Sequence, residues 1–225
     1  METYVIDKND VAEDGYYFGE ADLTNFDGNV HACTDLGRIK FRRSIRVLGE
    51  MVFPERTGLQ VDGEIDVSGR ISVGCGIIAL EDVFSGEGID AGSGIQSLNG
   101  KIMARGSIKA GRSLISGSRL ISAEGAIFSG ENIFAARDID AATDIFAERG
   151  ISANEQIRCF ENLTAGRGIT AGFSIDCKNL SSDLRIMAGL CRFRLPQPDE
   201  TEVRFVTLVK GEIAFGKPVQ KNLTA

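Results

Sequence analysis

The sequence has no tryptophan, one histidine and only four prolines, and aromatic residues fill just 7% of its 225 positions. A core without large rings has to be built from aliphatic and small side chains. No apolar run approaches the roughly 18 residues of a membrane-spanning helix, and the first residues show no basic segment followed by an apolar one. We therefore expect no membrane span and a cytoplasmic location.

The five cysteines are odd in number and none forms a C-x-x-C pair. This spacing argues against a disulfide framework and against a zinc site. The net charge of −7 argues against binding to a nucleic-acid backbone, which needs clustered Lys and Arg. An acidic surface suits solubility or contact with a basic protein. We predict neither a metal nor a cofactor.

What the sequence has in abundance is a six-residue repeat of the form aliphatic–x–small. Twenty aliphatic positions follow one another six residues apart, with one extra residue after the Ile95 hexad and a second after the Leu120 hexad. They are Leu59, Ile65, Ile71, Ile77, Val83, Ile89, Ile95, Ile102, Ile108, Leu114, Leu120, Ile127, Ile133, Ile139, Ile145, Ile151, Ile157, Leu163, Ile169 and Ile175.

A small side chain follows two positions after each aliphatic residue, for example Ala110 after Ile108 and Ala153 after Ile151. A spacing of two puts both side chains on one face of a strand, whereas a helix needs spacings of three and four. The remaining positions carry Gly, Asn, Asp, Ser and charged residues, which suit turns and surface. Each hexad is therefore predicted to be a short strand with two inward residues, followed by a corner.

One hexad per side gives a triangular coil of about 18 residues, so residues 18 apart should stack at the strand spacing of about 4.8 Å. Opposite charges do recur at this distance, as Arg137 with Glu155 and as the series Asp140, Arg158 and Asp176. The sequence thus predicts an all-β, three-sided parallel β-helix over residues 39–189. It does not determine the handedness of the coil.

Non-repetitive segments flank the repeat, and we interpret both as caps, because stacked strands expose edges that invite polymerisation. Residues 1–38 are aperiodic and acidic and carry four aromatic residues between positions 16 and 26. Residues 190–225 contain two alternating segments, 203–209 and 212–215, joined by Lys210 and Gly211. This pattern predicts a hairpin, which could also pair with another chain.

Residues 61–71 (VDGEIDVSGRI) and 106–110 (GSIKA) resemble the repeat of bactofilins, which are polymer-forming β-helix proteins of bacteria. The resemblance covers residues 59–175 and implies a three-sided β-helix that self-associates. The repeat is also similar to that of hexapeptide acyltransferases. In that family the small residue comes two positions before the aliphatic one and a catalytic histidine lies between coils, whereas here the only histidine, His31, lies outside the repeat.

Several residues suit chemistry but also have a structural interpretation, which we favour in each case. His31 and Cys33 could form a base and a nucleophile, or be part of the N-terminal cap. Cys159 and Cys177, which are 18 apart, could form a metal or redox pair, or fill the interior as small apolar residues. The carboxylates of residues 138–148 could serve a glycosidase, or form a charge ladder. We therefore predict no catalytic residue.

Two surface features remain as candidate binding sites. A basic run in the first coil is formed by Lys40, Arg42, Arg43 and Arg46, and could contact an acidic partner or simply be solvated. An aromatic stripe is the second candidate. Phe128 and Phe146 lie 18 apart at outward positions of one side, and Phe134 holds the same position on the next side above Ile115. Outward apolar side chains in register usually mark an interface.

These patterns lead us to expect a non-enzymatic β-solenoid that presents a rigid face to a protein partner and forms a homo-oligomer. Three alternatives stay open. They are a structural polymer of bactofilin type, an acidic rod that occupies the nucleic-acid site of a host protein, and a hexapeptide-type acyltransferase.

Overall fold

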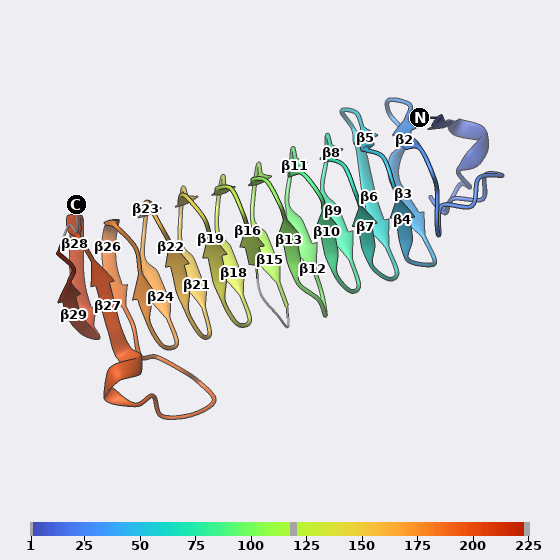
Figure 1. Cartoon of the computed structure of the whole chain (residues 1–225). Coiled ribbons are helices and arrows are strands. Elements are labelled where there is room, and N and C mark those ends of the chain that lie inside the picture. The colour runs from blue at the N-terminus through green and yellow to red at the C-terminus, as the bar shows by residue number, and fades with distance from the viewer. Residues whose placement is uncertain (1, 118–120, 223–225) are drawn as a thin grey trace.

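The computed structural model describes residues 2–117 and 121–222, which wind into a parallel β-solenoid whose coils stack along one axis (Figure 1). The N-terminal residues lie at one end of this rod and the C-terminal residues at the other (Figure 1). The helices of the described residues are two short 3-10 turns, η1 (Lys8–Asp10) and η2 (Pro198–Thr201). The predicted all-β, parallel β-helix is confirmed.

The strands stack in three columns, one for each side of the coil. The first side holds β1 (Thr3–Ile6), β2 (Asn29–Ala32), β5 (Met51–Phe53), β8 (Ile71–Val73), β11 (Ile89–Ala91), β14 (Ile108–Ala110), β17 (Ile127–Ser129), β20 (Ile145–Ala147), β23 (Asn162–Ala165), β26 (Asn179–Met187) and β28 (Thr207–Phe215). The second holds β3 (Gly37–Phe41), β6 (Thr57–Val61), β9 (Ile77–Ala79), β12 (Ile95–Ser97), β15 (Leu114–Ser116), β18 (Ile133–Ala135), β21 (Ile151–Ala153) and β24 (Ile169–Ala171), and continues into the later residues of β26 and β28. The third holds β4 (Ile45–Val47), β7 (Ile65–Val67), β10 (Val83–Ser85), β13 (Ile102–Ala104), β16 (Ile121–Ala123), β19 (Ile139–Ala141), β22 (Ile157–Cys159), β25 (Ile175–Asp176), β27 (Glu202–Phe205) and β29 (Lys217–Gln220).

The central coils contain 18 or 19 residues. Ile77 pairs with Ile95, 18 positions on, and Val83 pairs with Ile102, 19 positions on. Extra residues fall in corners, so the strands keep their register. One predicted rung was placed one residue too early, because Ile121, and not Leu120, stacks between Ile102 and Ile139. Leu120 itself lies outside the described residues.

Aliphatic residues of the three columns form one continuous core, and the first residue of most rungs is almost fully buried. The second inward position is Phe in β3 and β5, and Val, Ala, Cys or Ser in the rungs from β6 to β24. The inward serines also bond to the backbone: Ser85 donates to the carbonyl of Gly69 at 2.7 Å, and Ser116 donates to that of Gly100 at 2.7 Å. Alanine and serine can therefore alternate here, because the buried hydroxyl finds an acceptor at a corner.

Charge ladders on the outside confirm the three-sided stacking. The Nε atom of Arg137 lies 3.1 Å from Oε1 of Glu155, and Nε of Arg158 lies 2.7 Å from Oδ1 of Asp140. Asp176 follows in register beside Arg158. Such exposed pairs contribute little stability individually, and here they mainly show which residues are neighbours.

The N-terminal end of the rod is covered by irregular chain. β1 lies in parallel on β2, and residues 15–28 cross the outer edges of β3 and β4 through isolated bridges from Tyr16 to Lys40 and from Phe26 to Val47. The ring of Tyr17 packs 5.2 Å from that of Phe41. This end of the core is therefore shielded from water.

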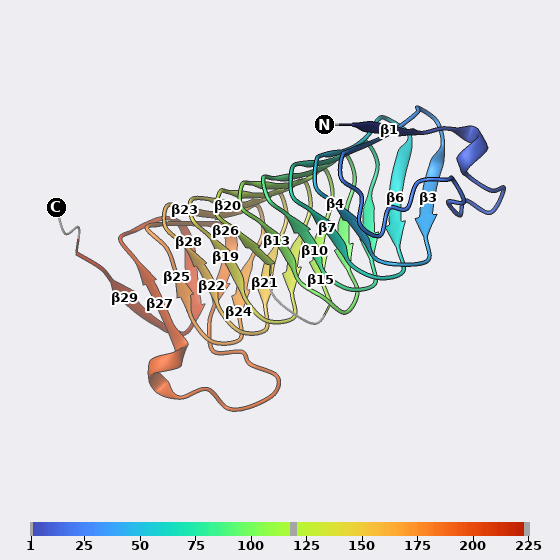
Figure 2. The ribbon, with the colours of Figure 1, turned by 45° about the vertical axis from the view of Figure 1, so that its right-hand side comes forward.

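The C-terminal end continues the solenoid, and the predicted hairpin is wrong. β28 pairs in parallel with β26, and β29 pairs in parallel with β27. Gly211 has the positive φ of 103° expected of a turn, but it makes a corner at which one long strand bends from the first side to the second. A Cβ there would lie 2.7 Å from the carbonyl oxygen of Ser182. Between β26 and β27, residues 188–201 form a loop that projects from the side of the rod (Figure 2).

Candidate functional site

Two phenylalanine side chains form an apolar step on the first side of the rod. Phe128 is the central residue of β17 and Phe146 that of β20, and the two residues pair in register. Their neighbours Ile127 and Ile145 point inward and are fully buried, so strand alternation turns both rings outward. The rings are 39% and 38% exposed, which leaves a surface available for contact.

The nearest neighbours of the two rings in this outward column are polar, although Val52 and the exposed Val5 lie further along it towards the N-terminus. Asp90 and Lys109 precede Phe128, and Thr164 follows Phe146. The two rings therefore form an apolar pair between polar residues of the same column. We call Phe128 and Phe146 the phenylalanine step.

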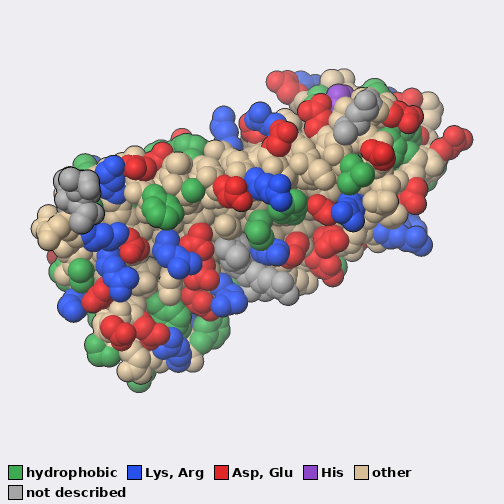
Figure 3. Space-filling view, viewed as in Figure 1, with side chains coloured by type: hydrophobic (Ala, Val, Ile, Leu, Met, Phe, Trp, Pro, Cys, Tyr) green, Lys and Arg blue, Asp and Glu red, His purple; other side chains and the backbone are tan. Residues whose placement is uncertain are grey.

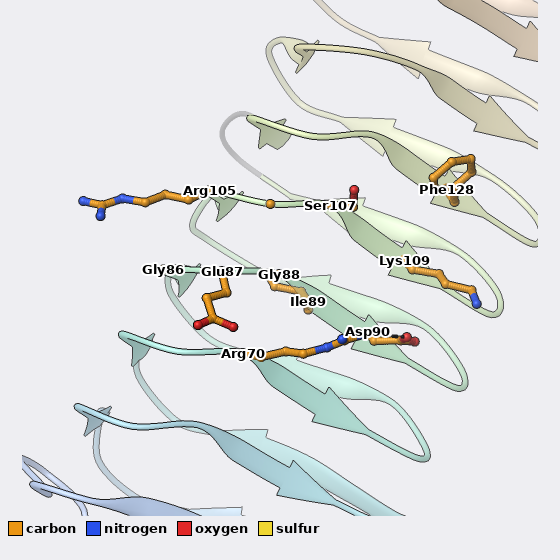
Figure 4. A pocket seen from close by; sticks show the side chains of 11 residues that line it. Arg70, Gly86, Glu87, Gly88, Ile89, Asp90, Arg105, Ser107, Lys109 and Phe128 are labelled. Carbon is orange, nitrogen blue, oxygen red and sulfur yellow. Dashed lines mark hydrogen bonds and ion pairs between the residues drawn. The ribbon is translucent and has the colours of Figure 1, made fainter. Parts of the chain in front are cut away.

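Shallow grooves lie on both sides of the phenylalanine step. A groove of about 520 Å³ is lined by both rings together with Lys109 and Glu148. A second groove, of about 480 Å³, extends from Phe128 past Lys109 to Arg70 and Asp90 (Figure 4). Figure 4 shows Arg70 lying along Asp90, and these side chains are 3.4 Å apart at their closest charged atoms. An apolar centre with charged rims is typical of a protein-binding surface.

Phe134 and Ile115, the other predicted members of the aromatic stripe, lie on the second side of the coil. They pair in register on β18 and β15, and both are half-buried. Ile115 lines a separate groove of about 510 Å³ with Ile78 and Arg112. The stripe therefore divides into two apolar surfaces on adjacent sides, of which the phenylalanine step is the more exposed.

Three residues of the predicted basic patch, Lys40, Arg42 and Arg46, contact groups of the same chain, and the fourth, Arg43, is exposed. The guanidinium of Arg42 lies 4.5 Å from the ring centre of Tyr16, and Nζ of Lys40 lies 5.3 Å from it and donates to the carbonyl of Asp14 at 2.7 Å. Arg46 pairs with Asp66 at 3.4 Å. The contacts of Lys40 and Arg42 with Tyr16 and Asp14 attach the N-terminal segment to the first coil.

His31 interacts with a carboxylate. Its Nε2 lies 3.2 Å from Oε1 of Glu50, and both side chains are partly exposed. Among the described residues, no hydrogen bond joins the side chains of His31 and Cys33, the candidate nucleophile. The backbone N–H of Cys33 donates to the carbonyl of Ile6. The structural interpretation of His31 as part of the N-terminal segment agrees with this geometry.

Cys159 and Cys177 stack in the interior of the third side, where both are buried. The neighbouring Cys177 thiol and burial together raise the pKa of the Cys159 thiol well above its usual range. A nucleophilic or metal-binding cysteine needs the thiolate, so Cys159 acts as a small apolar side chain, and the buried Cys177 packs beside it in the core.

The acidic cluster of residues 138–148 is engaged in the coil. Oδ1 of Asp138 accepts the N–H of Gln156 at 3.1 Å, and Oδ1 of Asp144 accepts that of Asn162 at 3.0 Å. Burial raises the pKa of Asp138, and the hydrogen bond from Gln156 partly opposes this rise. These carboxylates close corners between successive coils and do not face each other across a cleft.

One groove was not anticipated from the sequence. It has a volume of about 940 Å³ and runs along the third side near the C-terminal end, between Phe160 and the charged residues Arg158, Lys178 and Lys221. The ring of Phe160 is 76% exposed. The signal was present, because Phe160 occupies a corner position at which many other rungs carry glycine, as at Gly111 and Gly130.

The chain matches no family model, and no curated protein or solved structure is significantly similar to it. Among residues 2–117 and 121–222, no helix has the length and apolarity that a membrane crossing requires. Within the same residues, no three His, Cys, Asp or Glu side chains gather closely enough to hold a metal ion. Figure 3 shows Lys and Arg interspersed with Asp and Glu along one face of the rod.

Proposed function

We propose that the protein is a non-enzymatic scaffold whose rigid lateral face binds a protein partner through the phenylalanine step. The observation that carries this proposal is the pair Phe128 and Phe146, stacked in register and more than a third exposed between the polar residues Lys109 and Thr164 of the same column. Burying one such ring against a partner contributes about 1.5–3 kcal/mol, which makes the pair a suitable anchor.

Two features support binding over catalysis. The groups that could have served chemistry are engaged in other contacts, as with His31 and Glu50 or Asp140 and Arg158. The grooves beside the phenylalanine step are shallow and lie on the flat side of a coil, where a partner's surface can approach but a small substrate would stay in water.

The alternatives have less support. An acidic rod that imitates nucleic acid would need a band of one charge sign, whereas the visible face mixes both (Figure 3). A filament needs two ends that pair along all sides of the coil, whereas irregular chain occupies the edges of β3 and β4 at the N-terminal end. A hexapeptide-type acyltransferase would need a histidine between coils, and His31 is the only histidine.

The test compares two double variants in binding to proteins of a host-cell extract. Phe128→Ser with Phe146→Ser removes the step, while Phe84→Ser with Met103→Ser removes an equivalent in-register apolar pair from the third side. The proposal is supported if a protein of the extract binds to the parent and to the control variant but not to the first variant, and if the first variant keeps the thermal midpoint of the parent. Equal retention by both variants, or loss by both, contradicts it.

A further inference from the structure

The C-terminal end of the rod presents two edge strands. β28 pairs with β26 on one edge and β29 pairs with β27 on one edge, and within residues 2–117 and 121–222 no strand pairs with their outer edges. An unpaired edge carries N–H and C=O groups that can bond to another strand. Residues 188–201 do not cover this end, because their loop projects sideways (Figure 2).

The apolar columns of the core also end here without cover. Leu208 stands over the fully buried Leu180 and is 37% exposed, and Ile213 stands over the fully buried Ile186 and is half-buried. Val209 and Phe215 of the same strand are 63% and 51% exposed. Edge groups and apolar side chains therefore occur on one surface, which we call the open end.

We propose that the open end binds a second copy of this chain, end to end, about a two-fold axis that passes through the corner at Gly211. This corner divides β28 into residues 207–210 on the first side and 212–215 on the second, which are four residues each. A two-fold rotation about the corner lays the first half of β28 antiparallel against the second half of the partner strand. The same rotation lays β29 antiparallel against its own copy.

The sequence of β28 is complementary to itself in this register. Lys210 faces the partner's Glu212, and Glu212 faces the partner's Lys210, so two pairs of opposite charges cross the axis. Val209 faces the partner's Ile213, which brings an exposed apolar side chain onto a half-buried one. Charge complementarity of this kind fixes register and suppresses other partners.

The third side contributes less to this contact, because Pro218 in β29 has no N–H to donate. At the N-terminal end the bridges from Tyr16 and Phe26 occupy the edges of β3 and β4, so among the described residues only β1, on the first side, keeps an edge without a partner strand. Head-to-tail stacking is therefore disfavoured. A two-fold contact uses the open end of each copy and closes the assembly as a dimer.

This inference goes beyond the proposed function, which concerns the lateral face, and it uses none of the residues of the phenylalanine step. The two proposals can therefore fail separately. The dimer is measured by sedimentation equilibrium and by small-angle X-ray scattering. An end-to-end dimer has nearly twice the maximum dimension of the monomer, whereas a side-by-side dimer has almost the same one.

Charge reversal tests the register. Lys210→Glu places like charges at both crossings, and so does Glu212→Lys, so each variant alone should weaken the dimer about tenfold or more. An equimolar mixture of the two variants restores opposite charges at both crossings and should recover the long dimer. Lys8→Glu, the same charge change at the other end of the rod, should have no effect.

Circular dichroism checks that each variant is folded, since Lys210 also pairs with Asp183 of its own chain at 2.9 Å. A parent chain that stays monomeric overturns the proposal. So does a dimer that is compact, a dimer that both reversals leave intact, or a mixture that fails to associate although the parent does. If the double variant of Phe128 and Phe146 loses the partner but still forms the long dimer, the two contacts are separate and the end-to-end dimer is supported.

Discussion

The two ends of the rod finish the same column of inward residues in opposite ways. Ile39 begins the column of the second side and is fully buried, whereas Ile213 ends it and is only half-buried. After β1, the N-terminal segment does not follow the repeat, and isolated bridges place it across the outer edges of β3 and β4. The C-terminal segment forms one more coil. Its strands β28 and β29 cover the edges of β26 and β27, but they expose equivalent edges of their own. Stopping a solenoid thus requires chain that does not follow its strand pattern.

The two ends should differ most in how far an introduced aspartate lowers the free energy of unfolding. Ile39→Asp should lower the free energy of unfolding by about 3–5 kcal/mol, because the carboxylate would be buried without a partner. Urea unfolding, followed by circular dichroism, measures this change.

Ile213→Asp is the matched control at the other end of the column. It should cost less than about 1 kcal/mol at a protein concentration at which the chain is monomeric, because water reaches this position. Equal losses in the two variants would show that the ends are shielded alike, and would contradict the comparison.

A smaller effect is expected from the aromatic contacts of the N-terminal segment. Tyr17→Ala should cost about 2 kcal/mol, because the ring contacts both Tyr4 and Phe41, at centroid distances of 6.4 and 5.2 Å. Phe215→Ala, which removes a half-exposed ring from the open end, should cost clearly less. Thermal unfolding of both variants settles the order, and a more costly Phe215→Ala would reverse our interpretation of the two ends.

A local effect of pH is expected near the C-terminal end. The bidentate pair with Arg194 and the N–H of Gln197 lower the pKa of Glu200 to about 2 from its usual 4.5. Because the pKa is lower in the folded state, the contact stabilises the loop above about pH 4.5 and is lost as the pH falls towards 2. Hydrogen exchange should show faster exchange of the Gln197 amide at pH 2.5 than its intrinsic pH dependence predicts. Unchanged protection of the Gln197 amide would show that the Arg194–Glu200 pair does not order the loop.

The smallest effect concerns fraying, and it requires no substitution. In a stack of coils that contact only their neighbours, an open end loosens before a covered one. Cys177 and Cys159 are buried in successive coils near the open end, whereas Cys33 is exposed. Thiol labelling of the native protein should modify Cys33 at once and then Cys177 before Cys159. Simultaneous labelling of the two buried thiols only on global unfolding would mean that the C-terminal coils do not fray.

Most of the fold followed from the repeat, because a period of six with two inward positions leaves few alternatives. The pairs Arg137–Glu155 and Asp140–Arg158 confirm that the coil has three sides. The register around Leu120 and Ile121 was misjudged because two adjacent aliphatic residues each fit the pattern, and only stacking on Ile102 distinguishes them.

The ends were harder to predict than the coils. A Lys-Gly pair between alternating segments suits a hairpin turn and a solenoid corner equally, and long-range pairing with β26 decides for the corner at Gly211. The outward positions of Phe128 and Phe146 followed from the spacing, since strand alternation fixes them. Their role in binding stays a prediction, because a local pattern does not specify what approaches the surface.

The columns of in-register residues also make the length of this molecule adjustable in fixed steps. Deleting residues 127–144 would bring Ile145 onto Ile108, which pairs with Ile127 at present, and each later residue would inherit an equivalent neighbour. The rod would shorten by one strand spacing, about 4.8 Å, with both ends unaltered. Gain or loss of whole coils by unequal recombination would therefore change the distance between the covered end and the open end in steps of one strand spacing.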